Sequence, residues 1–499
     1  MKKRRFLITV IATMLVALLA SPTMARQFTV GGRPLNLFGY VTQGAALSLR
    51  GADNYDTEQD LQGLLFNLFL EGDYKFTSNL KLYAAGMLTA DWVYDIKHDD
   101  RSWDDKLFNK SRDNLYIDDE YWQLLKELHV TWTPGNFMFR VGKQIVGWGE
   151  TDGFRLMDQI NPLDQRRGMA DVEFETSIIP IWLLRAEYFL RTDSTWFQDL
   201  GFEFIFNPNA DFIPNQMLMG NDEGGIWSPN ILIPLGPGMD AHLGSANMNI
   251  EEPDSWSEGH EFGFRLKGVV NDAFITLNYF YGIDDSPVTK MAAAPPSMGM
   301  ASDGKPIIHA NMEGYYPRFR FAGATFSRDI TSLRASFLGG VAPVVRMEGF
   351  YGFDNTFATS LNTFEKSDEL RWALGVDWKV KIPFLNPMAY FMVSPQFYHR
   401  KIMDYPTGYS FANLQEDNYM TSLMMNTTYF HNKIVPMFFW LHDVNNHADM
   451  YKLQLTYDYS SEWHYTVGAL FLNGQEPGNG FQIFENKDYI YFKISYKWN

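Results

Sequence analysis

The chain has 499 residues, a formal net charge of −17 and no cysteine. The lack of cysteine excludes disulfides, thiolate metal sites, a cysteine nucleophile and haem attached through Cys-x-x-Cys-His, and the acidic balance argues against a nucleic-acid partner. Hydrophobic residues make up 46% of the chain and aromatic residues 16%, yet no apolar run beyond residue 25 approaches the roughly 20 residues of a membrane-spanning helix. Apolar residues must therefore alternate with polar ones, which is typical of strands.

The first 25 residues have the pattern of a secretory signal peptide. Four cations at positions 2–5 precede the apolar segment 6–20, and Thr23 and Ala25 are small residues at the positions before a cleavage site. We predict that residues 1–25 are removed and that the mature chain begins at Arg26, with a charge of about −21 once the four cations are lost. A retained signal anchor is the alternative.

Segments with a period of two follow along the rest of the chain. In "LRWALGVDWKV" (370–380), Leu370, Trp372 and Leu374 lie on one face of an extended strand, and Arg371 and Asp377 lie on the other. "LFNLFLEGDYKF" (65–76) and "YKLQLTYDYS" (451–460) repeat this design. Such segments of about 10 residues match the length of a tilted strand that crosses a bilayer.

Short and long links alternate between these segments. Links such as 77–79, 134–136 and 431–433 are short, whereas 150–177, 208–259 and 284–313 are long. This alternation is typical of outer-membrane barrels, which have tight periplasmic turns and larger extracellular loops. We therefore predict that residues 26–499 form one all-β domain, a transmembrane antiparallel up-and-down β-barrel of about 18 strands with both termini periplasmic. Sixteen strands remain possible because the stretch 332–352 is long and contains Pro343.

The last strand, "DYIYFKISYKWN" (488–499), has an apolar face and a face that carries Lys493 and Lys497. We expect it to close the ring against 35–49, because an unpaired edge in lipid would leave backbone groups unsatisfied. Its aromatic residue near the C-terminus resembles the signal read by the outer-membrane assembly machinery, although Asn499 follows Trp498 here. A strand of a soluble sandwich is the alternative.

Several blocks resemble a known family. "PLNLFGYVTQG" (34–44), "RVGKQIVGWGE" (140–150) with "INPLD" (160–164), and "LNPMAYFMVSPQFY" (385–398) are similar to a family of Gram-negative outer-membrane proteins known as domain of unknown function thirteen-oh-two. The resemblance covers most of the chain. It implies a porin-like barrel in the outer membrane of a Gram-negative bacterium, surrounded by outer-membrane lipid. It supplies no established substrate and no catalytic residues.

The alternation also predicts which cations face the lumen. The candidates for lining the pore are Arg140, Arg185, Arg265, Lys267, Arg318, Arg320, Arg346, Arg371 and Lys379. Inward arginines would concentrate anions and bind carboxylate or phosphate in bidentate fashion. The alternative is that they pair with inward acids and brace the wall.

The long link 150–177 is the candidate constriction loop, because it follows the block of strongest resemblance and carries opposed charges. These are Asp152, Arg155, Asp158, Asp164, Arg166 and Arg167. If the loop folds inward, the two signs of charge would set up a transverse field across a narrow opening, by analogy with general porins. An ordinary surface loop is the alternative, and 208–259 is a second candidate plug.

The sequence predicts no enzyme and no cofactor. His129 and His464 lack the neighbouring serine that a barrel phospholipase would need, and neither His-Glu-x-x-His nor a glycine-rich phosphate loop occurs. The leading hypothesis is a porin-like channel for small anionic or amphipathic solutes. The alternatives are a sheath around separate c-type cytochromes that form an electron conduit, and a transporter of hydrophobic substrates with a lateral gate near Pro180 or Pro343.

Overall fold

The computed structural model describes most of the chain after the predicted signal peptide, which lies outside the described residues. Those residues are 26–50, 61–93, 124–151, 155–163, 177–192, 194, 196–210, 232–236, 239–253, 256–300, 304–412, 414–476, 479–484 and 487–498. None of the helices in these ranges has the length and apolar character of a membrane span.

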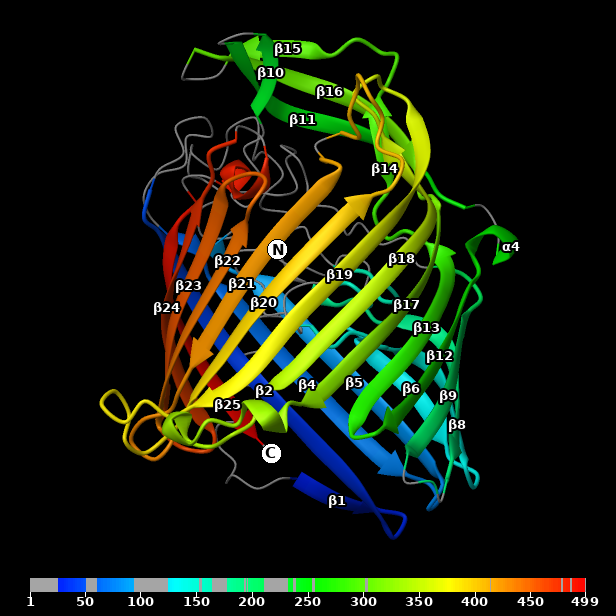
Figure 1. The fold of residues 1–499 in the computed structure, drawn as a ribbon, viewed down its shortest axis with the longest axis vertical. Helices are drawn as coiled ribbons and strands as arrows, with labels where there is room; N and C mark the ends of the chain where they lie inside the picture. The colour runs from blue at the N-terminus through cyan, green and yellow to red at the C-terminus, as the bar shows by residue number, and fades with distance from the viewer. Residues whose placement is uncertain are drawn as a thin grey trace, which may run out of the picture.

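Eighteen antiparallel strands form a closed barrel, as predicted (Figure 1). Each strand pairs with the next along the chain, and the ring closes where the first strand pairs with the last, from Gly39 opposite Trp498 to Ser48 opposite Tyr489. The barrel strands are β2 (Arg33–Ser48), β4 (Leu65–Lys75), β5 (Leu80–Asp91), β6 (Glu127–Trp132), β7 (Phe137–Gln144), β8 (Ile181–Leu190), β9 (Phe197–Asn207), β12 (Glu261–Val270), β13 (Ala273–Ile283), β17 (Arg318–Asp329), β18 (Val344–Ala358), β19 (Phe364–Val380), β20 (Phe391–Ile402), β21 (Asp417–Asn426), β22 (Ile434–Asp443), β23 (Ala448–Asp458), β24 (Trp463–Asn473) and β25 (Tyr489–Trp498).

The two faces of the barrel wall reverse the pattern of a soluble protein. Large apolar side chains on the outer face are exposed, among them Val141 at 57% and Leu277 at 53%. Polar side chains on the inner face are buried, among them Thr276, Glu369 and Ser394. Outward apolar residues match the acyl chains of a bilayer, and inward polar residues match a hydrated or loop-filled lumen.

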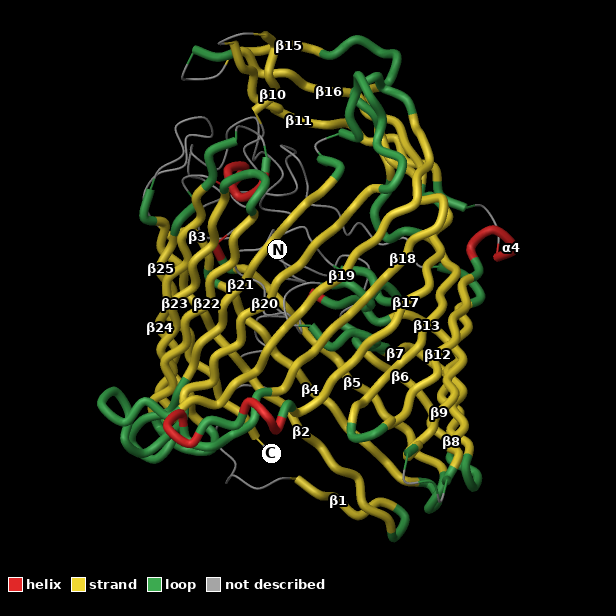
Figure 2. Tube along the Cα trace, in the orientation of Figure 1, coloured by secondary structure: helices red, strands yellow, loops and turns green. Residues whose placement is uncertain are grey.

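One end of the barrel carries mostly short links and both described ends of the chain (Figures 1 and 2). The strand β1 (Arg26–Val30) forms a hairpin with the start of β2, from Val30 opposite Arg33 to Arg26 opposite Leu37. Because β25 pairs with β2 only from Gly39 onward, β1 covers the part of the β2 edge that β25 leaves open. This hairpin blunts an edge that would otherwise be free for pairing.

The stretch 332–352, which left sixteen strands possible, is a link followed by a single strand. Residues 330–343 connect β17 to β18 and contain the 3₁₀ turns η4 (Thr331–Leu333) and η5 (Ser336–Leu338). Pro343 stands immediately before β18, where no ladder donor is needed. The count of eighteen rather than sixteen follows from this arrangement.

At the opposite end a second sheet stands over the barrel (Figure 1). It comprises β10 (Leu232–Gly236), β11 (Met239–Glu251), β14 (Val288–Met291), β15 (Ser297–Met300) and β16 (Pro306–Tyr315), with the short helix α4 (Trp256–Gly259) leading back to the barrel. The order is β10-β11-β16-β14, and β15 also pairs with β16. A parallel pairing of β11 with β16 joins the two long links 208–259 and 284–313, which the sequence predicted only as loops.

Candidate functional site

The chain that follows β7 turns back into the barrel. We call residues 145–151 and 155–163 the inward segment. Its apolar side chains Val146, Trp148, Leu156, Met157 and Ile160 are buried in one cluster with residues of the inner wall. The wall residues of that cluster are Ile181, Leu183, Ile205, Phe280, Phe319, Phe321 and Phe350, from β8, β9, β13, β17 and β18. The segment therefore fills one side of the lumen instead of extending outward.

Two side chains of the inward segment hold its own backbone in shape. The Asp158 carboxylate accepts hydrogen bonds from the backbone N–H groups of Trp148 at 2.6 Å and Gly149 at 2.8 Å. The Asn161 amide accepts from the N–H of Val146 at 2.7 Å and donates to the carbonyls of Gln144 at 3.2 Å and Ile179 at 3.0 Å. These bonds hold residues 146–149 close to Asp158 and Asn161.

Charged side chains on the inner face of the barrel wall bind the inward segment. Glu203 on β9 accepts a hydrogen bond from the Trp148 indole N–H at 2.9 Å, and Glu348 on β18 accepts from the N–H of Thr151 at 2.6 Å and from that of Glu150. Arg346 donates to the carbonyl of Glu150, and Arg265 donates to the carbonyl of Gly147 at 3.3 Å. Because hydrogen bonds to ionised groups are stronger than neutral ones, these contacts fix the segment on the wall.

Two wall glycines make room for the segment. A Cβ atom on Gly263 would lie 2.6 Å from Cη2 of Trp148, and one on Gly323 would lie 2.6 Å from Cε of Met157. No side chain fits at such distances without displacing the tryptophan or the methionine. The inner surface of the wall is therefore shaped to receive the inward segment.

The inward-facing candidates are largely paired with acids. Arg185 lies 2.6 Å from Glu187 and 3.1 Å from Glu203, and Lys267 lies 2.6 Å from Glu187. Arg346 lies 2.8 Å from Asp377, and Arg371 and Arg400 lie 2.5 and 2.6 Å from Glu369. Arg140 donates to the Thr131 hydroxyl at 3.1 Å, Arg265 contacts the inward segment, and Lys379 is exposed. The inner wall beside the inward segment is thus a mixed network rather than a positive lining.

Arg318 and Arg320 do not face the lumen, so their predicted orientation is wrong. On β17 the residues Phe319 and Phe321 take the inner face and pack on the inward segment, which places the arginines on the outer face. Arg318 lies over the Tyr281 ring with 5.1 Å between guanidinium and ring centroid, and Arg320 pairs with Asp354. The usual alternation reverses here because the lumen at this height is filled with apolar side chains.

Part of the predicted constriction loop lies in the inward segment. Arg155 donates to the carbonyl of Asn161 at 2.5 Å, and Asp158 braces the backbone as described above. Asp152, Asp164, Arg166 and Arg167 lie outside the described residues.

Burial raises the pKa of the Glu150 carboxyl, against the opposing effect of Arg265 and Arg346. Burial also raises the pKa of Asp285, in the link after β13, well above its ordinary value, and Glu261 acts in the same direction while Arg155 opposes.

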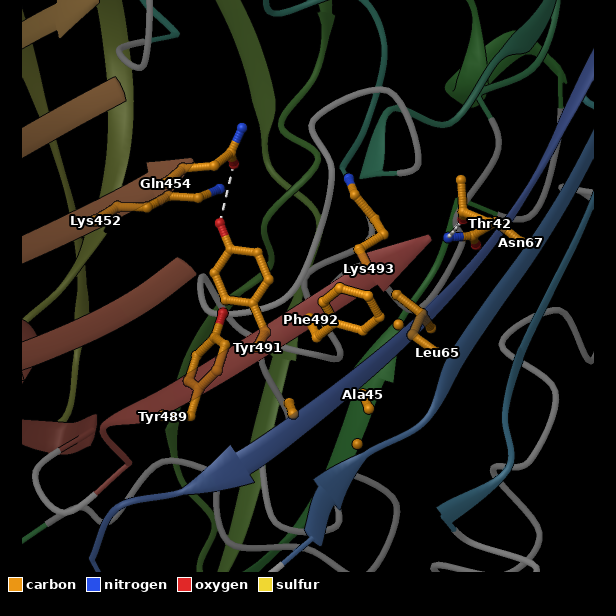
Figure 3. A pocket seen from close by; sticks show the side chains of 13 residues that line it. Thr42, Ala45, Leu65, Asn67, Lys452, Gln454, Tyr489, Tyr491, Phe492 and Lys493 are labelled. Carbon is orange, nitrogen blue, oxygen red and sulfur yellow. Dashed lines mark hydrogen bonds between the residues drawn. The ribbon is translucent and has the colours of Figure 1, made fainter. Parts of the chain in front are cut away.

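A cavity lies at the closing seam of the barrel (Figure 3). We call it the seam cavity; its volume is about 60 Å³, and its lining comes from β2, β4, β23 and β25 and the end of β3 (Leu61–Gly63). Its polar lining residues are Thr42, Asn67, Lys452, Gln454, Tyr489, Tyr491 and Lys493. Two ammonium groups and two phenol rings thus meet at one place on the lumen wall.

The shape of the seam cavity is set by close packing between strands. Tyr491 lies across β24 and donates from its hydroxyl to Gln454 at 2.9 Å. This is possible because β24 has a glycine there: a Cβ atom on Gly468 would lie 2.4 Å from Cζ of Tyr491. Beyond the cavity, Phe481 and Phe484 of the turn η6 (Gly480–Phe484) pack with Tyr489 in a separate apolar cluster. The alternation along β25 predicted that Lys493 faces inward. Lys452 and Gln454 also line the cavity, because β23 lies next to β24 and β24 lies next to β25, and the pattern of β25 alone does not show this.

Comparison with known proteins identifies the family. The family described as "Protein of unknown function (DUF1302)" matches residues 9–498. The chain belongs to this family. The Pseudomonas aeruginosa protein OccK5 (OpdH) is 9% identical, with a TM-score of 0.46 over 93% of this chain and 98% of that one. Acinetobacter baumannii OccAB1 is 9% identical, with a TM-score of 0.45 over 95% and 98%. Salmonella typhi OmpF, in a complex with daunomycin, is 9% identical, with a TM-score of 0.39 over 95% and 100%. No curated protein matches significantly.

Proposed function

We propose that this DUF1302 chain is an outer-membrane channel that admits small anionic or amphipathic solutes past the seam cavity. A barrel of eighteen strands is wide enough for an aqueous passage unless a loop fills it. In the part of the chain that the structure describes, the inward segment packs against β8, β9, β13, β17 and β18. The passage therefore runs along the opposite wall, which β2 and β23 to β25 form.

The observation that carries the anionic preference is that Lys452 and Lys493 both line the seam cavity. On the other side of the lumen Arg185 and Lys267 pair with Glu187 and Glu203, Arg346 pairs with Asp377, and Arg371 pairs with Glu369. Lys452 and Lys493 line the seam cavity beside hydroxyl and amide groups, and their positive charge attracts carboxylate or phosphate. The ring of Tyr491, which is only partly buried, adds a flat surface for the apolar part of an amphipathic solute.

The test is the reversal potential of the purified protein in a planar lipid bilayer across a gradient of potassium chloride. We expect anion preference in the wild type and a shift toward cations in the Lys452→Gln, Lys493→Gln variant. Lys433→Gln is the matched control, because this exposed lysine lies in the link between β21 and β22, away from the lumen wall. Absence of conductance, or cation preference in the wild type, would contradict the proposal.

Neither alternative from the sequence gains support. The inward segment occupies part of the space that cytochromes threaded through the barrel would need. Pro180 and Pro343 both lie just before a strand, and the ladders beside them run without a register shift, from Gln144 opposite Ile181 and from Asp329 opposite Val344. A lateral gate at either proline has no structural motive.

A further inference from the structure

Three methionines lie directly opposite one another on three neighbouring strands of the sheet above the barrel. In β11 and β16, which are parallel, Met248 is opposite Met312, and in β14 and β16, which are antiparallel, Met291 is opposite Met312. Neighbouring strands lie about 4.8 Å apart, and residues directly opposite share one face of the sheet. The three thioethers therefore form a row, with Met312 in the centre. We call it the methionine row.

The residues next to the central methionine, Met312, are small. Along β16, the residues next to Met312 on the same face are Ala310 and Gly314. Methionine has three rotatable bonds, so the two outer side chains can lean over the central one to bring three sulfur atoms together. Met291 is 39% exposed, so the row is reachable from solvent.

The row differs from ordinary apolar packing in its composition. A sheet face that needs only to be covered is normally built from β-branched and aromatic residues, and methionine has no special preference for strands. Three methionines in register, from two links separated along the chain by a barrel hairpin, instead provide three soft neutral donors on adjacent strands. Thioether ligands select soft ions such as Cu(I) over zinc, magnesium or calcium.

Harder ligands do not compete at this site. Among the residues that the structure describes, no three His, Asp or Glu side chains are grouped so that they could hold a metal ion. The nearby pair Lys290–Glu313, at 3.2 Å, lies at alternate positions and thus on the other face of the sheet. The net charge of −17 still draws cations toward the molecule over longer distances.

We propose that the methionine row is a binding site for a soft monovalent metal ion, Cu(I) or its analogue Ag(I). The site takes one ligand from β11 in the link after β9 and two from β14 and β16 in the link after β13. A bound ion therefore ties the two links together above the mouth of the barrel. This inference is independent of the proposed channel function, because none of its residues lies in the lumen.

The test is titration of the purified full-length protein in detergent with Ag(I), which needs no reductant, against a chromogenic competitor. We expect one tightly bound ion per chain and at least a tenfold loss of affinity in the Met248→Leu, Met291→Leu, Met312→Leu variant. Leucine nearly conserves the volume of methionine, so the sheet should persist. The matched control is Met239→Leu, Met298→Leu, Met300→Leu, which replaces three exposed methionines of the same sheet and should bind as the wild type does.

A second measurement guards against a variant whose sheet fails to fold. X-ray absorption of the wild-type complex should show Ag(I) surrounded by sulfur alone, and bound Ag(I) should slow proteolysis of the links 208–259 and 284–313. Oxygen or nitrogen ligands in that spectrum would overturn the proposal. Equal affinity in the row variant, or loss of affinity in the control instead, would overturn it as well.

Discussion

At the scale of single residues, the contacts between wall and inward segment decide whether the lumen is narrowed. Gly263 shows this most simply, because the wall at this point has room for the Trp148 indole only while no Cβ is present. Glu203 accepts a hydrogen bond from the indole N–H, so steric fit and hydrogen bonding both position the Trp148 side chain. Neither feature is visible in the sequence, since Gly263 lies 115 positions from Trp148.

Gly263→Ala should displace Trp148 and destabilise the fold by about 1–3 kcal/mol, as is usual when a tight site is overpacked. With the inward segment loosened, single-channel conductance should rise. Both effects can be measured, by unfolding in denaturant and by planar-bilayer recording. Gly349→Ala is the control, because a Cβ there would meet no atom within 4 Å. Unchanged conductance in Gly263→Ala, with Trp148 fluorescence unaltered, would contradict the account of this contact.

Glu348→Ala should free the backbone of Glu150 and Thr151 from the wall. Two partly buried N–H groups would lose their acceptor, at a cost of about 1–3 kcal/mol each where water cannot replace it. We expect larger and noisier current through the channel. Asp354→Ala removes an exposed ion pair on the outer face and should change little. The account fails if the two variants give the same current trace.

At the scale of elements, the strands could be predicted from the sequence far better than the long links. The period of two on β25 predicted Ile490 and Phe492 as outward, and both are exposed on the outer face. It failed at Arg318 and Arg320 because the inward segment makes one part of the lumen apolar. The parallel pairing of β11 with β16 could not be predicted, since it depends on contacts between two links rather than on local pattern.

The inward segment should also make the channel sensitive to pH. Because the folded protein raises the pKa of Glu150 and of Asp285, both carboxyls take up protons at a higher pH than ordinary carboxyls do. Protonation removes negative charge from the inward segment at Glu150 and from the link after β13 at Asp285, so anion preference should increase as the pH falls, beginning above the ordinary carboxyl range. Reversal potentials recorded between pH 8 and pH 4 test this. A preference that decreases on acidification would contradict the assigned shifts.

At the scale of the whole molecule, the barrel is a cylinder with apolar residues outside and polar residues inside, filled on one side by the inward segment. Family membership and composition made this architecture predictable, because the outer and inner residues alternate along nearly every strand. The seam cavity was less accessible to prediction. Its residues come from both ends of the chain, and only closure of the ring by β2 and β25 brings Thr42 and Asn67 next to Lys493.

The most direct measurement of this account is cysteine accessibility along β25, since the chain has no cysteine of its own. Single cysteines would replace Ile490, Tyr491, Phe492 and Lys493. Each variant, reconstituted into vesicles, would be treated with a charged thiol reagent that does not enter lipid. We predict rapid labelling at Tyr491 and Lys493, with a change in channel current, and no labelling at Ile490 and Phe492. Equal labelling at all four positions, or labelling of the two outward positions alone, would contradict a lipid-facing exterior around a hydrated lumen.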